Sequence, residues 1–147
     1  MTTNWRENLV DSAAGIEALL RATKRIAVLG MKTEEQAGQP ALYVPEYMME
    51  TGHEIFPVLV YYPEVTDVLG RKVYRKVADV PGPIDMVNVF RRPADVAAHL
   101  DDLLAAKPTS VWLQQGIRSD TVAEALARAG ILVVQDRCLM VEHRRLR

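Results

Sequence analysis

Short apolar runs alternate with segments of helical periodicity along this chain. Each run holds four to seven residues and is dominated by Val, Ile, Leu and other apolar residues. The runs cover residues 25–29, 54–60, 84–90, 110–113 and 131–134. Runs of this length are too short for typical helices, and they are typical of strands that are buried on both faces of a parallel sheet.

Helical patterns precede the first run and separate most of the others. They cover residues 11–23, 40–51, 93–106 and 119–129. Strands that alternate with helices imply right-handed crossovers. The pattern therefore predicts an α/β fold, a three-layer doubly wound Rossmann-like domain with a five-stranded parallel sheet in the order 3-2-1-4-5. In that order, the loops after Leu29 and Leu113 face each other across a crevice at the switch point of the sheet.

The loop from Gly30 to Gln39 is the first candidate for function. It is long and polar, it carries Lys32, and it leads to Pro40 at the start of a helix. The free N–H groups of a helix N-terminus favour an anion. The dinucleotide pattern G-x-G-x-x-G is absent, because only Gly30 and Gly38 are available, and this argues against a standard nicotinamide site. A surface loop with an ordinary lysine is the alternative.

Two further polar groups follow predicted strands. Arg91 and Arg92 come after the third run and suit a phosphate or carboxylate, although a solvated pair or an ion pair with Asp95 or Asp79 is an alternative. Gln114 and Gln115 with Gly116 end the fourth run. Their amides can bond amides or a ribose, and the glycine permits close backbone approach. A plain strand-to-helix turn is the alternative there.

Composition limits the class of protein. The 147 residues suit one domain, with a helix over about 11–23, a core over 25–135 and a tail over 136–147. The net charge of −1 argues against a nucleic-acid partner, and no apolar run approaches the roughly 20 residues of a membrane span. A single cysteine, Cys138, excludes an internal disulfide and indicates the cytoplasm. Cys138 with His143 could form a catalytic pair, but a structural cysteine is favoured.

Several stretches, taken in order, resemble the small stand-alone CoA-binding proteins. The resemblance covers residues 16 to 143 and also extends to the CoA-binding domain of the succinyl-CoA synthetase α subunit. The stretches are IAVLG (26–30), IFPV (55–58), LGRKVY (69–74), NVFRRP (88–93), VWLQQGI (111–117) and DRCL (136–139) with EH (142–143). The resemblance implies binding of CoA or acyl-CoA without catalysis, because the ligase's phospho-histidine lies in a second domain that this chain is too short to contain.

The resemblance also implies where the ligand lies. The loop from Gly30 to Thr33 would meet the phosphates or the pantetheine arm, Val58 to Tyr62 with Lys72 would meet the adenosine, and Leu113 to Gln115 would line the pantetheine path. The full predicted binding set is Gly30, Met31, Lys32, Thr33, Val58, Tyr61, Tyr62, Lys72, Phe90, Arg91, Arg92, Leu113, Gln114, Gln115 and Gly116. A sensor of NAD(P) or another adenine nucleotide is the alternative function. An acyl-CoA enzyme and a second copy of the chain are the candidate protein partners.

Overall fold

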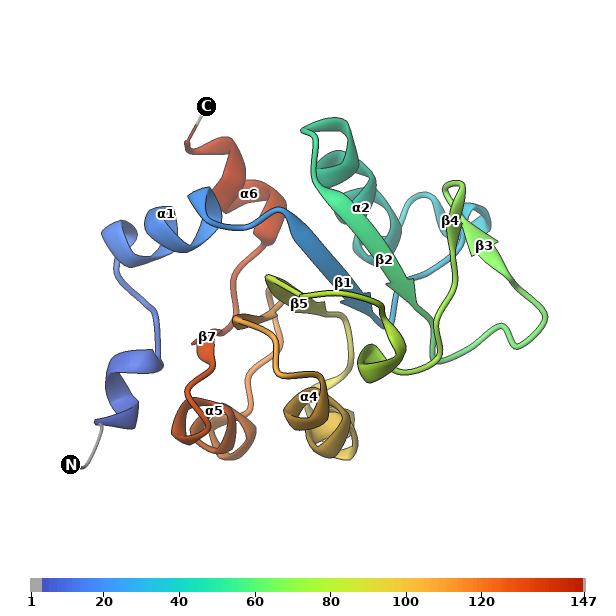
Figure 1. Cartoon of the computed structure of the whole chain (residues 1–147). Coiled ribbons are helices and arrows are strands. Elements are labelled where there is room, and N and C mark those ends of the chain that lie inside the picture. Colours follow the sequence, from blue (N-terminus) through green and yellow to red (C-terminus); the bar gives the residue numbers. More distant parts are fainter. Residues whose placement is uncertain (1–3, 147) are drawn as a thin grey trace.

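The computed structural model describes residues 4–146, in which helices cover both faces of a central parallel sheet (Figure 1). The elements are, in chain order, η1 (Trp5–Asn8), α1 (Ala13–Arg21), β1 (Arg25–Leu29), η2 (Glu34–Gln36), α2 (Pro40–Glu50), β2 (Glu54–Val58), β3 (Asp67–Val68), β4 (Arg71–Lys72), η3 (Val77–Asp79), β5 (Met86–Val89), α3 (Pro93–Val96), η4 (Ala97–His99), α4 (Leu100–Ala106), β6 (Ser110–Leu113), α5 (Asp120–Arg128), β7 (Leu132–Val134) and α6 (Leu139–Arg144). The Rossmann-like α/β fold with five parallel strands is confirmed.

The predicted strand order is wrong. The sheet runs β2-β1-β5-β6-β7, which is 2-1-3-4-5 in chain order, with every neighbouring pair parallel. The order reverses between β1 and β5, so the switch point lies there and not between β1 and β6. The loops that face each other across it are therefore those after Leu29 and Val89, with the loop after Leu113 one strand further on.

Pro57 explains why β2 lies at the edge. Proline has no N–H group to donate and is confined to edge strands or strand ends. In the structure the Pro57 carbonyl faces away from β1 and accepts from Tyr74 N at 2.8 Å. Leu59 N donates to Tyr74 O at 3.0 Å, and Arg71 Nε donates to Ile55 O at 3.0 Å. The segment 71–74 thus covers the outer edge of β2.

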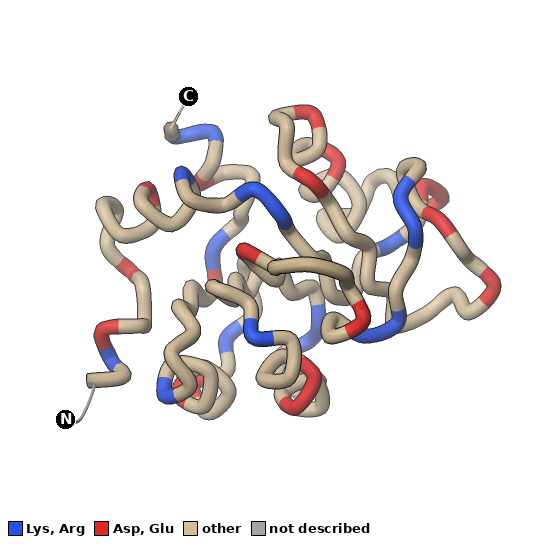
Figure 2. The backbone as a smooth tube through the Cα atoms, viewed as in Figure 1, with Lys and Arg blue, Asp and Glu red and all other residues tan. Residues whose placement is uncertain are grey.

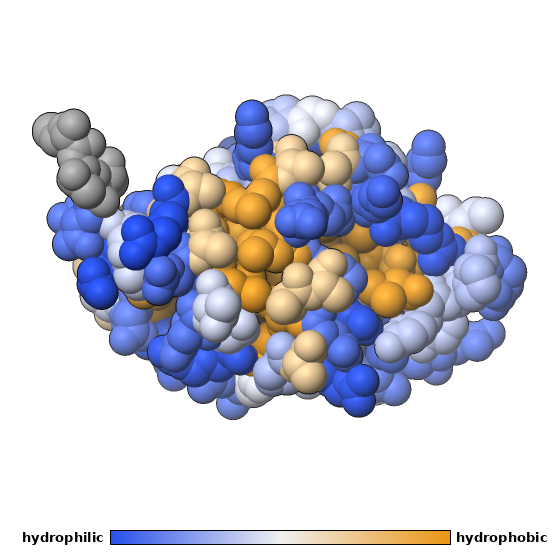
Figure 3. Space-filling view, turned by 90° about the horizontal axis from the view of Figure 1, so that it is seen from below, coloured by the Kyte–Doolittle hydropathy of each residue, from blue (hydrophilic) through white to orange (hydrophobic). Residues whose placement is uncertain are grey.

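The two faces of the sheet bury separate apolar clusters. Helices α1, α2 and α6 cover one face, where Leu42, Met48 and Trp112 are fully buried. Helices α4 and α5 cover the other face with Leu103 and Leu126. Apolar residues gather near the centre of the side that carries α4 and α5, inside a polar rim (Figure 3).

The C-terminal tail belongs to the packed structure, which corrects the predicted boundary of the core at residue 135. Trp112 Nε1 donates to Arg137 O at 2.8 Å, and Leu139 at the start of α6 is 1% exposed. The sequence did not indicate this contact, because the few apolar residues of α6 stand among charged residues. The predicted helix over 93–106 is also divided, because η4 separates α3 from α4.

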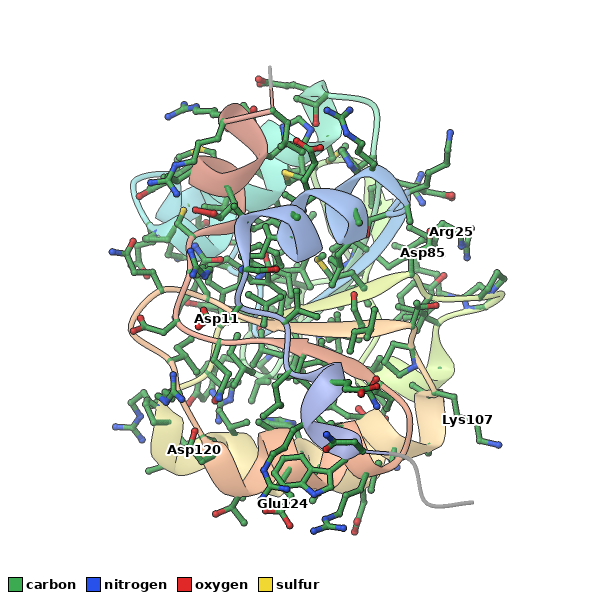
Figure 4. All side chains as sticks on the ribbon, turned by 90° about the vertical axis from the view of Figure 1, so that its left-hand side faces the viewer. Asp11, Arg25, Asp85, Lys107, Asp120 and Glu124 are labelled. Atoms are coloured by element: carbon green, nitrogen blue, oxygen red, sulfur yellow. The ribbon has the colours of Figure 1, made fainter. Side chains whose placement is uncertain are left out.

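The ends of the strands define two opposite edges of the sheet (Figure 4). Arg25 and Asp85 lie together at the amino edge, where Asp85 Oδ2 accepts from Lys24 N at 3.0 Å and Arg25 N at 2.8 Å. Asp120, which follows β6, lies at the carboxyl edge. In such sheets ligands bind beyond the carboxyl ends of the strands, so this second edge is the one that bears on function.

Basic and acidic residues are interspersed along the backbone (Figure 2). This distribution agrees with the net charge of −1. Within residues 4–146, no helix has the length and apolar character that a membrane span requires.

Candidate functional site

A cavity of about 350 Å³ lies at the carboxyl edge, between the first turn of α2 and the ends of β5 and β6. The residues that line it come from the loops after β1, β5 and β6 and from the starts of α2 and α3. They are Gln39, Pro40, Ala41, Phe90, Arg91, Arg92, Pro93, Gln114, Gln115, Gly116 and Ile117. The cavity thus joins the predicted arginine pair, the predicted glutamine pair and the predicted helix N-terminus, and its volume falls within the range of small-molecule sites.

Gly30 ends β1 directly against the backbone that follows β5. Its φ is +85°, and its N–H donates to Val58 O at 2.9 Å. A Cβ atom at this position would lie 2.4 Å from Phe90 O. The glycine is therefore required by the close approach of two chain segments, and this approach brings the loops after β1 and β5 together at the switch point.

The N-terminus of α2 carries no side-chain cap. Gln39 is the N-cap residue and makes no capping hydrogen bond, while Pro40 takes the first helical position. Leu42 N and Tyr43 N both donate to Gln39 O, at 2.9 and 3.0 Å. The positive end of this eleven-residue helix thus contributes to the cavity wall, where it favours a negatively charged group.

Arg91 is held in place by three neighbours. Its side chain is 13% exposed; Nε donates to His99 Nε2 at 3.1 Å, Nη1 donates to Tyr61 Oη at 3.2 Å, and Nη2 lies 3.8 Å from Asp95 Oδ2. His99 must be neutral to accept this bond. Burial, and next the charge of Arg91, lower the pKa of His99 and so favour that neutral form. The hydrogen bond from Arg91 also lowers the pKa of Tyr61.

Two more cations lie near this arginine. Arg92 is 83% exposed and bonds Asp95 Oδ2 at 3.0 Å. Lys32 Nζ lies 5.6 Å from the ring centre of Tyr61 and 5.7 Å from that of Tyr62. The structure thus brings the loops after β1, β2 and β5 together at the carboxyl edge of the sheet.

Arg75 holds the loop that carries the two tyrosines. Its guanidinium donates to the carbonyl oxygens of residues 61, 62, 63 and 65, at 3.0, 2.9, 3.2 and 2.9 Å. Tyr62 takes a left-handed conformation in this loop, with φ of +61°. The exposed Tyr61 and the half-buried Tyr62 are therefore attached to a constrained backbone, although the sequence there shows no regular element.

Gln114, Gln115 and Gly116 lie on the β6 side of the cavity. Gln114 is 4% exposed, and its Oε1 accepts from Leu139 N and from Asn88 Nδ2, both at 3.3 Å. Gln115 is exposed. Gly116 has φ of +86°, and a Cβ atom there would meet no atom within 4 Å. Space beside the backbone is thus present at Gly116, in contrast to Gly30.

Other predicted residues lie outside the cavity. The side chains of Met31, Val58 and Leu113 are at most 2% exposed and pack in the two apolar clusters, so only their backbone could meet a ligand. Thr33 is the N-cap residue of η2, and its side chain accepts from Glu35 N at 3.3 Å. Lys72 lies on β4, with Nζ 5.4 Å from the Tyr74 ring, beyond the outer edge of β2.

Sequence reasoning missed Asn88 and His99. Asn88 interrupts an apolar run, which is a visible signal for a buried polar group, and it bonds Gln114 behind the cavity wall. His99 stands alone in a predicted helix, and nothing in the sequence links it to Arg91.

The other histidines lie away from the cavity. His143 Nδ1 lies 2.9 Å from Tyr47 Oη, and its ring is 5.3 Å from that of His53. Across residues 4–146, no three His, Cys, Asp or Glu side chains are arranged to hold a metal ion.

Comparisons with known proteins agree with this geometry. A family model described as CoA binding domain matches residues 24–144. The protein YneT of Bacillus subtilis is 33% identical over 132 residues, which cover 90% of this chain and 94% of that protein. A structure of cell-free ID.343 from Thermus thermophilus is 40% identical with a TM-score of 0.84, over 93% of this chain and 100% of that one.

A more distant structure shares the fold alone. It is the dinucleotide-forming acetyl-coenzyme A synthetase 1 from Ca. Korarchaeum cryptofilum, in complex with phosphate and ADP. It is 20% identical with a TM-score of 0.62, over 78% of this chain and 26% of that one. The same arrangement of strands and helices therefore occurs as a small part of a larger enzyme.

Proposed function

Because this chain belongs to the family of CoA binding domains, we propose that it binds CoA or an acyl-CoA in the cavity at the carboxyl edge of the sheet. The ligand takes the switch point between β1 and β5, which is where a doubly wound sheet offers a crevice. The chain then acts as a binding module without catalysis of its own.

The observation that carries this proposal is the meeting of cations and a helix N-terminus at one cavity. The guanidinium of Arg91 is immobilised at the cavity wall, and the start of α2 adds a partial positive charge. CoA carries several phosphate charges, and hydrogen bonds to charged groups contribute about 1.5–3 kcal/mol each. A phosphorylated ligand thus matches the charge of this wall.

The rest of the site suits the remaining parts of CoA. Tyr61 is 53% exposed and offers an aromatic face beside Lys32 and Arg91. Aromatic faces of this kind stack on bases. Gln114 and Gln115 offer amides on the β6 side, which suit the amide-bearing arm. In this arrangement the adenosine lies toward the loop after β2 and the arm lies toward β6.

Calorimetry with CoA tests the proposal. Arg92→Ala removes an 83% exposed cation beside the cavity, and Arg21→Ala on α1 removes an exposed cation far from it, which makes it a matched control. We expect about tenfold weaker binding for Arg92→Ala, or about 1.4 kcal/mol, and unchanged binding for Arg21→Ala. The absence of heat with millimolar CoA in the wild type would reject the proposal.

Ligand-dependent melting separates CoA from other adenine nucleotides. A ligand present at 100 times its dissociation constant stabilises the fold by about 2.7 kcal/mol. We expect CoA and acetyl-CoA to raise the melting temperature, and AMP and NAD to raise it much less. Equal shifts with AMP would favour the adenine-nucleotide sensor. Hydrolysis of acetyl-CoA by the protein would contradict the proposed absence of catalysis. Gel filtration with and without CoA tests whether the chain associates with a second copy of itself.

A further inference from the structure

A buried pair of amide side chains lies behind the β6 side of the cavity. Asn88 on β5 is 1% exposed, and its Nδ2 donates to Trp112 O at 3.4 Å and to Gln114 Oε1 at 3.3 Å. Among the described residues, Asn88 Oδ1 is the one fully buried side-chain oxygen or nitrogen without a hydrogen-bond partner. Such an atom has a free-energy cost and requires a physical reason.

The backbone of α6 determines how both amides are oriented. Leu139 N can only donate, and it points at Gln114 at 3.3 Å, so the atom that it meets must be the oxygen Oε1. Asn88 then faces an acceptor and must present Nδ2, which leaves its own oxygen without a donor. Neither amide can rotate without placing two donors or two acceptors against each other.

In this network, the side-chain NH₂ group of Gln114 remains available to donate a hydrogen bond into the cavity. Its oxygen already accepts two hydrogen bonds, while its Nε2 donates to no atom of residues 4–146 and is not among their fully buried unpartnered atoms. Gln114 lines the cavity, so the accessible group is an NH₂. A neutral donor between apolar neighbours such as Ile117 suits a neutral acceptor better than a charged one.

We propose that Asn88 is a positioning residue, which locks Gln114 as a hydrogen-bond donor, and that this donor selects a carbonyl oxygen on the amide-bearing arm of the ligand. The inference rests on the proposed function, because CoA supplies such an arm. The unpartnered oxygen of Asn88 is the cost of this lock, since an apolar residue at the same buried position would leave no polar atom unpaired but would remove one of the two hydrogen bonds that hold Gln114 Oε1.

Two variants test the lock against two ligands. Asn88→Leu removes the lock and the unpaired oxygen together, with a side chain of similar size. Gln114→Glu keeps an acceptor for Leu139 N and removes the donor. The ligands are CoA and adenosine 3′,5′-bisphosphate, which is the nucleotide part of CoA without the arm. Calorimetry gives the affinity of each ligand for each protein, and urea unfolding gives the stability.

We expect Asn88→Leu to bind CoA about tenfold more weakly, with unchanged affinity for the bisphosphate and no loss of stability. Gln114→Glu lowers the CoA affinity by at least tenfold more than the bisphosphate affinity.

The outcomes separate the two proposals. If wild-type protein does not bind CoA, the proposed function fails and the arm recognition fails with it. If wild-type protein binds CoA but the variants bind it equally well, or lose CoA and bisphosphate affinity to the same extent, the inference alone is wrong. Should Asn88→Leu not fold, Gln114→Glu decides the question through its ratio of CoA to bisphosphate affinity.

Discussion

Gly30 and Gly116 form a natural matched pair for mutation. Both follow a strand at the carboxyl edge, and their φ angles are +85° and +86°. They differ in the space beside them, since a Cβ atom at Gly30 would lie 2.4 Å from Phe90 O and 3.1 Å from Arg91 Cδ, whereas at Gly116 nothing lies within 4 Å. Alanine at both positions therefore separates the cost of the backbone conformation from the cost of close packing.

The two costs can be worked from general values. The left-handed conformation costs a residue with a Cβ atom about 1–2 kcal/mol, and this applies to both variants. Overpacking against backbone adds about 1–3 kcal/mol, and this applies to Gly30→Ala alone. We therefore expect Gly116→Ala to lose about 1–2 kcal/mol of unfolding free energy and Gly30→Ala to lose about 2–5 kcal/mol.

Urea unfolding measures this difference. Trp112 is fully buried in the apolar cluster beneath α6, so its fluorescence reports the loss of packing, and far-UV circular dichroism reports the helices. For a chain of this length, 1 kcal/mol corresponds to about 2–4 °C in melting temperature. If the two variants are destabilised equally, then the contact between Gly30 and Phe90 is not what requires glycine, and the account of the switch point is wrong.

Three further predictions concern groups around the sheet. Asp85→Ala leaves two backbone N–H groups at the amino edge without their acceptor, and we expect a loss of about 1–2 kcal/mol in urea unfolding. The lowered pKa of His99 means that the unfolded chain binds its proton more readily, so stability falls as the pH drops below about 6.5. His99→Gln reduces this dependence in urea unfolding between about pH 5 and 8, and an unchanged slope would contradict the buried, neutral histidine. Arg75→Lys replaces a planar guanidinium by a point charge and frees the carbonyls of residues 61–65, so we expect about tenfold faster native-state proteolysis of this loop, whereas unchanged cleavage would show that Arg75 does not restrain it.

The fold class follows from the sequence. The strand order, in contrast, was predicted without using the information that Pro57 gives about the edge of the sheet. Five Val- and Ile-rich runs separated mainly by helical patterns are enough to predict a parallel sheet. The side on which β5 joins β1 is not encoded in those patterns. Pro57 does carry the information, because a strand with proline in its middle fits an edge far better than an interior place. The predicted order put that strand between two others.

The sequence predicted those residues of the candidate site that come directly after a strand. Arg91, Arg92 and Gln114 converge because parallel strands deliver the residues after them to one edge. Their orientations could not be predicted, since they depend on partners far along the chain. Gln114 is oriented by Leu139, and Arg91 is held by Tyr61, thirty residues before it. Met31 was included because it lies in the loop that the resemblance assigns to the ligand, whereas its side chain packs in an apolar cluster.

The covered border of the sheet limits how this protein can assemble. Arg71 and Tyr74 occupy hydrogen-bonding groups along the outside of β2, and Val10 N donates to Val133 O on the outside of the three-residue β7. Few unpaired backbone N–H and C=O groups therefore remain at either edge for a strand of another polypeptide to bind. Formation of one continuous sheet across two molecules is disfavoured, so any association would use the surfaces of the helices and the loops.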